Sequence, residues 1–204
     1  DGTRPTAMQA NRLVAGFALG SMLLSAPMAA FNTVLIPQTV SRLSGINRVT
    51  DLAMLVIAGA IMTFLLNACI AVGSDHSYCR FGRRTPWIVS GSVLAAICMA
   101  ILSVCDFLPW AVFFWLATQA AYAMAAIPFA AAFGERVPDK FRDRADSWHG
   151  KGLALGQLVG VAVAVALTPH AGGEGWDGTT GFAKLVVAGW LVVAAVVTLL
   201  VLPF

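Results

Sequence analysis

The chain has 204 residues, of which 59% are hydrophobic and only 11% are charged, and its formal net charge is +3. Ordinary globular domains contain about 25% charged residues, and a water-soluble fold of this length has too little interior to bury so much apolar surface. The composition therefore excludes a typical soluble domain, and the small net charge argues against a nucleic-acid partner. We expect lipid to be the solvent and the first partner of this chain.

Six apolar runs are long enough to cross a bilayer as helices, since a span needs about 20 residues. In chain order they are Leu13–Ile36, Leu52–Gly73, Pro86–Cys105, Pro109–Phe133, Gly152–Thr168 and Phe182–Leu202. Thr85-Pro86 is a typical helix start. Thr168-Pro169 ends the fifth run, because a residue before proline is disfavoured in a helix. The sequence therefore predicts an all-α membrane protein.

Basic residues are distributed unequally between the two sides of the predicted bundle. Ten lie before the first span or in the loops after the second and fourth spans, and three, Arg42, Arg48 and Lys184, lie on the other side. The positive-inside rule then places both termini in the cytoplasm, which agrees with an even number of spans. A charge at the centre of a span costs several kcal/mol, so we expect Lys184 and Asp106 to reach water near helix ends.

Motifs of enzymes and metal sites are missing from the sequence. It contains no H-E-x-x-H, no G-x-S-x-G and no Walker loop. His76, His149 and His170 are far apart, and the four cysteines form no C-x-x-C pair, so we interpret the cysteines as small buried apolar side chains. We expect no catalytic residues, no metal and no cofactor.

The most specific motif is GSDHSYCRFGRRTPWI, which occupies residues 73–88 between the second and third spans. Asp75 should lie at the C-terminal end of a helix, the negative pole of its dipole, where a carboxylate is disfavoured by about 0.3–1 kcal/mol. Arg80, Arg83 and Arg84 supply compensating cations in a loop bent at Gly82. The alternative is a solvated basic loop that only obeys the positive-inside rule.

This string resembles the signature of the major facilitator superfamily, and its spacing is similar to that of the branch with plant sucrose transporters and glycoside–pentoside–hexuronide symporters. The resemblance implies a six-helix lobe of two inverted three-helix repeats and secondary transport by alternating access. It also implies a latch that joins two lobes on the cytoplasmic side. The latch residues that it implies are Asp75, Arg80, Gly82, Arg83 and Arg84, with His76 where the family usually has arginine.

The resemblance extends into the second span. Asn67 lies eight residues before Asp75, where melibiose-permease-like symporters carry an aspartate that serves the coupling cation. Asn67 can form hydrogen bonds but cannot release a proton. A weaker resemblance covers Val137–Ala145, which is similar to the P-x-x-x-R-x-R-A loop between spans four and five of such carriers.

Few polar residues are expected at membrane depth, and transporter sites are built from such residues near the midplane. We predict that five of them bind substrate, namely Asn32, Asn67, Gln119, Tyr122 and Gln157, with Thr33 beside them. Neutral hydrogen-bonding groups with aromatic neighbours suit a hydroxyl-rich solute such as a sugar. The alternative for each residue is an interhelical hydrogen bond, worth about 0.6–2 kcal/mol in membranes.

Small residues recur every four positions in the fifth span, at Gly152, Gly156 and Gly160. Such a stripe lets another helix approach closely, and we interpret it as a packing face. The family resemblance places this span toward a partner lobe, so the stripe is a candidate for the contact between lobes.

Two functions stay open. One is secondary transport of a small solute, with residues 1–204 as a single six-span lobe in a multi-pass protein of a plasma membrane of the bacterial inner-membrane type. The chain is then either one lobe of a full carrier or a half-size carrier that pairs with a second copy of itself. The other is a non-transporting membrane protein that binds a partner through glycine-rich helix faces.

Overall fold

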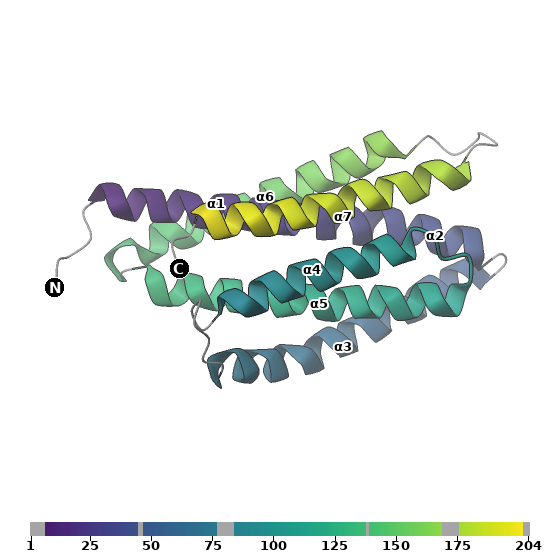
Figure 1. The fold of residues 1–204 in the computed structure, drawn as a ribbon, viewed down its shortest axis with the longest axis horizontal. Helices are drawn as coiled ribbons and strands as arrows, with labels where there is room; N and C mark the ends of the chain where they lie inside the picture. The colour runs from purple at the N-terminus through teal and green to yellow at the C-terminus, as the bar shows by residue number, and fades with distance from the viewer. Residues whose placement is uncertain (1–6, 45–46, 77–83, 138, 169–175, 202–204) are drawn as a thin grey trace.

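The computed structural model describes residues 7–44, 47–76, 84–137, 139–168 and 176–201, and within these ranges every regular element is helical (Figure 1). The helices are α1 Ala7–Ala30, the π-helical turn η1 Phe31–Leu35, α2 Ile36–Leu43, α3 Arg48–His76, α4 Thr85–Leu102, α5 Leu108–Arg136, the 3-10 turn η3 Asp139–Phe141, α6 Arg142–Leu167 and α7 Trp176–Val201. Among the described residues, six helical stretches are long and apolar enough to cross a membrane.

Each of these six stretches corresponds to one expected span, and the largest differences in boundaries lie in three helices. One of them is α7, which begins at Trp176 rather than at Phe182. The first stretch continues through η1 and α2 to Leu43. The helix of the fifth span begins at Arg142 rather than at Gly152, because its first turns are too polar to be recognised by apolar character. Arg142 and Arg144 are exposed there, and Arg142 donates a hydrogen bond to the carbonyl of Gly134, 3.1 Å away.

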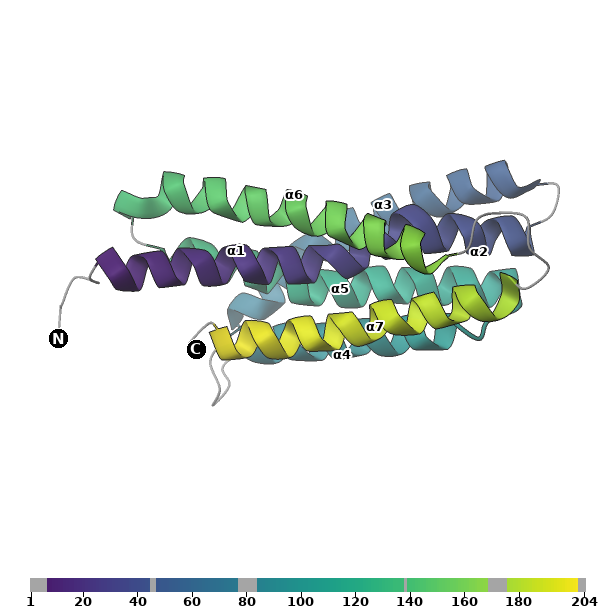
Figure 2. The ribbon, with the colours of Figure 1, turned by 90° about the horizontal axis from the view of Figure 1, so that it is seen from above.

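The helices run side by side along the long axis of the molecule (Figures 1 and 2). Their contacts form a series in the order α6, α1, α7, α4, α5, α3, and α2 packs against α3 and α5. Helices α6 and α3 stand at the two ends of this series. Only 22% of the apolar stretch of α6 and 17% of that of α3 are buried, against 61% for the first span.

The position of α3 corrects one expectation about the cysteines. Cys98 of α4 is buried and Cys105 is half-buried, but Cys69 of α3 is exposed. The outer face of α3 has no neighbouring helix within the described residues, and Phe64 of α3 is likewise 78% exposed. A small apolar residue on this helix therefore faces outward, where lipid or another protein would cover it.

Lys184, near the start of α7, corrects a second expectation. Its side chain is only 2% exposed and does not reach water as the sequence predicts. The reason is that α7 packs against α4, so that the ammonium group meets the last carbonyl of α4. Nearby, Arg42 of α2 forms an ion pair with Asp106 at 2.9 Å and donates to the carbonyl of Cys105 at 3.3 Å.

Candidate solute-binding cavities

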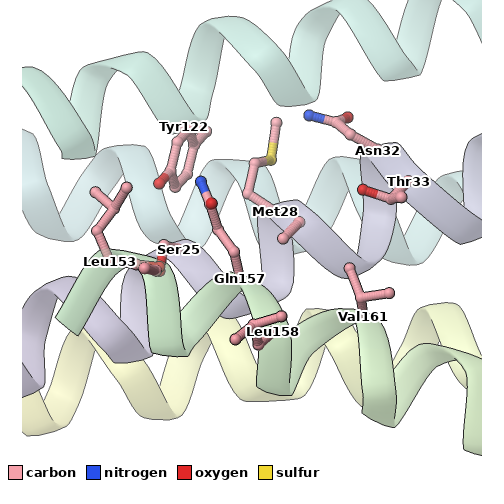
Figure 3. A pocket seen from close by; sticks show the side chains of 11 residues that line it. Ser25, Met28, Asn32, Thr33, Tyr122, Leu153, Gln157, Leu158 and Val161 are labelled. Carbon is pink, nitrogen blue, oxygen red and sulfur yellow. The ribbon is translucent and has the colours of Figure 1, made fainter. Parts of the chain in front are cut away.

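Two cavities share one wall at Asn32, which η1 carries. The first cavity has a volume of about 800 Å³, and its polar lining consists of Ser25, Asn32, Thr33, Tyr122 and Gln157 (Figure 3). The second cavity has a volume of about 520 Å³, and its lining includes Asn32, Thr63, Asn67, Trp115 and Gln119. The first cavity is lined by α1, η1, α5 and α6, and the second is lined by η1, α2, α3 and α5.

All five residues predicted to bind substrate line one or both cavities. Tyr122 and Gln157 lie in the first cavity, Asn67 and Gln119 lie in the second, and Asn32 belongs to both. The structure thus brings together residues from four spans that the sequence separates by up to 125 positions, from Asn32 to Gln157. Their role in binding a solute stays a prediction.

A hydrogen-bonded chain fixes Asn32 at the junction. The indole Nε1–H of Trp115 donates to Asn32 Oδ1 at 3.2 Å. Asn32 Nδ2 in turn donates to Gln119 Oε1 at 3.5 Å. Trp115 is only 4% exposed, and Gly59 of α3 leaves the space that its ring occupies, because a Cβ there would clash with the indole.

The first cavity holds polar groups that are available to a ligand. Among the described residues, the Tyr122 hydroxyl, the Gln157 amide and the Thr33 hydroxyl have no hydrogen-bond partner. Figure 3 shows the Tyr122 hydroxyl and the Gln157 amide directed from α5 and α6 toward the same part of the cavity. Ser25 is different, since its hydroxyl donates to the Leu153 carbonyl at 3.2 Å.

The described lining of both cavities is electrically neutral. It contains amides, hydroxyls, an indole and apolar side chains, and no charged side chain. Neutral polar groups bind uncharged solutes through hydrogen bonds, and an apolar wall adds contact area. This arrangement suits a small, uncharged molecule that carries several oxygen atoms.

The π-helical turn positions Asn32 and Thr33. Ile36 N–H donates to the carbonyl of Phe31, five residues back, so the helix widens by one residue at this point. Pro37 follows directly, and it lacks an N–H and would press its ring against the carbonyl of Thr33 in a regular helix. The wide turn accommodates the proline, and π turns of this kind are frequent at functional sites.

The sequence did not identify three polar lining residues, Ser25, Thr63 and Trp115. Serine and threonine in membrane helices usually bond to a carbonyl of the preceding turn, so their sequence positions carry no signal of a cavity. Tryptophan is common at the membrane interface, and its direction is not visible in the sequence. A hint was the position of Trp115 four residues before Gln119, which places both on one helix face.

The glycine stripe packs within the chain, not against a partner lobe. A Cβ at Gly152, Gly156 or Gly160 would clash with backbone atoms of Ala18, Met22 or Ala26 of α1, respectively. All three glycines are buried. The candidate contact between lobes through this stripe is therefore wrong, because α1 already occupies it. The stripe instead holds α6 against α1, so that Gln157 can reach the first cavity.

The candidate latch lies mostly outside the described residues. This applies to Arg80, Gly82 and Arg83, and to the side chain of Asp75, whose backbone belongs to the last turn of α3. Arg84 is described, directly before α4, and its side chain is 8% exposed. The latch therefore stays a prediction.

Within the described residues, no group of three or more histidine, cysteine, aspartate or glutamate side chains could hold a metal ion. A comparison of the chain with models of known protein families finds no match, and a comparison with curated proteins finds none either.

Proposed function

We propose that this chain is one lobe of a secondary transporter that binds a neutral, hydroxyl-rich solute, a sugar, and moves it by alternating access. The observation that carries this proposal is the pair of uncharged polar cavities that meet at Asn32. Binding near the middle of spans, at the interface of helical repeats, is typical of secondary transporters.

The order of helix contacts supports an architecture of two repeats. The first three spans are α1, α3 and α4, and the last three are α5, α6 and α7. Exchanging α1 with α5, α3 with α6 and α4 with α7 turns the contact series α6, α1, α7, α4, α5, α3 into the same series in reverse order. This is the behaviour expected of two three-helix units related by a two-fold axis. Because each unit has an odd number of spans, the second unit enters the membrane from the opposite side, which is an inverted repeat.

The uncovered helices support a partner for the lobe. Helices α3 and α6 each contribute to one cavity and keep most of their apolar surface outside the bundle. A second lobe, or a second copy of the chain, that covered α3 and α6 would also cover the cavity wall that each of these helices provides. Such a partner could alternately open the cavities to either face of the membrane, with the Asp75–Arg84 segment as the cytoplasmic latch of a plasma-membrane carrier.

The rival function is partner binding through the glycine-rich face, and this face is not available to a partner. The stripe on α6 is packed against α1 of the same chain. No other observation favours a non-transporting role, so we retain transport as the single proposal.

Binding and uptake measurements on the purified full chain in liposomes test this proposal. Glucose, galactose, xylose and sucrose form the probe panel. We expect at least one of them to bind, and expect Asn67→Ala and Gln157→Ala to weaken its binding by roughly 3- to 10-fold each, as for the loss of one hydrogen bond. Asn47→Ala, an exposed asparagine outside both cavities, is the matched control. Absence of binding for the whole panel, or equal binding by all variants, would overturn the proposal.

A further inference from the structure

We propose that Trp115 sets the direction of the hydrogen bonds at the junction of the two cavities, so that Gln119 turns the N–H donors of its amide toward the solute. The junction then selects solutes that place an acceptor oxygen next to Gln119. This inference rests on the proposed function, since it specifies which chemical face of the solute the lobe recognises.

The first step is the chemistry of the indole. Its Nε1–H can donate a hydrogen bond but cannot accept one. At 3.2 Å from the Asn32 side chain, it requires the oxygen of that amide, and not the nitrogen, to face it. An asparagine side chain has no preference of its own between its two orientations, so Trp115 determines which end of Asn32 points where.

The second step transmits this orientation to Gln119. With the Asn32 oxygen turned to Trp115, its Nδ2 group faces Gln119, and Gln119 must present its oxygen at 3.5 Å. The other end of the Gln119 amide is then its NH2 group, which forms no hydrogen bond to any described residue. Since Gln119 lines the second cavity, two N–H donors are available there.

The third step concerns the role of Trp115 itself. Its side chain is 4% exposed and fills the space left by Gly59, so it has almost no surface with which to contact a solute. Trp115 therefore acts as a positioning residue through Asn32. Without its N–H, both amides could rotate, and the junction could offer either donors or acceptors.

The test separates acceptors from donors on the solute. For the panel sugar that binds most tightly, each hydroxyl is replaced in turn by hydrogen and by fluorine, because fluorine can accept a weak hydrogen bond but cannot donate one. At the position next to Gln119, the fluoro analogue should bind roughly 3-fold or more tightly than the deoxy analogue. Trp115→Phe, which keeps an aromatic ring beside Gly59, should bring this ratio close to one.

Trp110→Phe is the matched control, because Trp110 lies on α5 at 57% exposure and lines neither cavity. It should leave the ratio unchanged. A second variant, Asn32→Asp, keeps the proposal testable if Trp115→Phe does not fold. The aspartate accepts from both Trp115 and Gln119, so Gln119 should turn its oxygen to the cavity, and the fluoro analogue should lose its advantage.

The outcomes distinguish the two proposals. If the wild-type chain binds no panel sugar, the proposed function fails. If it binds a sugar but no position favours fluorine over hydrogen, or if the ratio survives both Trp115→Phe and Asn32→Asp, the role of Trp115 is overturned while the proposed function stands.

Discussion

The ammonium group of Lys184 donates a hydrogen bond to the carbonyl oxygen of Leu102, 3.3 Å away, from a side chain that is 2% exposed. Leu102 is the last residue of α4, where the helix dipole is negative and favours a cation. Its carbonyl also accepts the Cys105 N–H at 3.4 Å, so the lysine of α7 adds a charged donor to this helix end and joins two helices that are far apart in the sequence.

This contact predicts different results for two substitutions of Lys184. Lys184→Met keeps most of the side-chain volume and removes the buried charge, so the free energy of unfolding should change by no more than about 1–2 kcal/mol. Lys184→Glu places a carboxylate against the negative end of α4 and should cost about 3–5 kcal/mol. Thermal unfolding in detergent measures both, with the exposed Lys151→Met as control. Equal losses for Met and Glu would contradict the dipole argument.

Replacing a glycine of α6 by alanine should separate packing from helix propensity. At Gly160 the added Cβ would meet the backbone of Ala26, whereas at Gly189 of α7 it would meet nothing within 4 Å. Overpacking of this kind costs about 1–3 kcal/mol, while alanine at an open helix position is favoured over glycine by up to about 1 kcal/mol. Gly160→Ala should therefore unfold at a lower temperature than the wild type.

Gly189→Ala should unfold at an equal or higher temperature, measured in the same detergent. If both variants shifted in the same direction, the close approach of α6 to α1 would not be the reason for the glycine stripe.

Ser21 and His149 form a hydrogen bond between α1 and α6 whose direction is fixed by the serine. The Ser21 hydroxyl donates to the Phe17 carbonyl at 2.6 Å, so its oxygen accepts from His149 Nδ1–H. The imidazole also stacks on Phe133, with ring centroids 5.0 Å apart. Ser21→Ala removes the acceptor and should cost about 1–3 kcal/mol, because a partly buried N–H is left without a partner.

His149→Phe gives the matching comparison. It keeps a ring against Phe133, and the Ser21 hydroxyl keeps its bond to Phe17. The free energy of unfolding should therefore fall by less than in Ser21→Ala. Thermal melts of the two variants decide the matter, and a larger loss in His149→Phe would show that the imidazole has another partner.

The six-helix fold was predictable because hydrocarbon imposes a simple condition. Each span must be about 20 apolar residues long and hydrogen-bonded within itself, and apolar runs reveal this directly. The start of α6 at Arg142 was missed, since a helix that continues into water no longer needs apolar residues.

The candidate site was predictable in part of its lining but not in its arrangement. Polar residues are rare at membrane depth, so Asn32, Gln119 and Gln157 could be identified from their positions inside the apolar runs. Which of them meet depends on helix order and rotation, and these follow from packing details such as the fit of Trp115 beside Gly59. The burial of Lys184 has the same origin, because it depends on where α7 packs against α4.

The distribution of charge predicts how the bundle is oriented in the membrane, and labelling can test this prediction. Asp106, whose side chain is 85% exposed, should lie outside the cell, whereas the exposed Arg144, in the basic stretch of α6, should lie in the cytoplasm. In a chain without native cysteines, Asp106→Cys should react with a membrane-impermeant maleimide on intact cells. Arg144→Cys should react only after permeabilisation.

The native Cys105 is unsuitable as the outer probe in this experiment. Burial raises the pKa of its thiol above the ordinary value, although Lys184 partly opposes this, and a thiol with a raised pKa reacts more slowly because the thiolate is the nucleophile. Asp106→Cys removes only an exposed ion pair with Arg42, worth about 0–1 kcal/mol, so the fold should persist. Labelling of Arg144→Cys on intact cells, with Asp106→Cys protected, would show that the bundle has the opposite orientation. The Asp75–Arg84 segment would then lie outside the cell, where it could not act as a cytoplasmic latch.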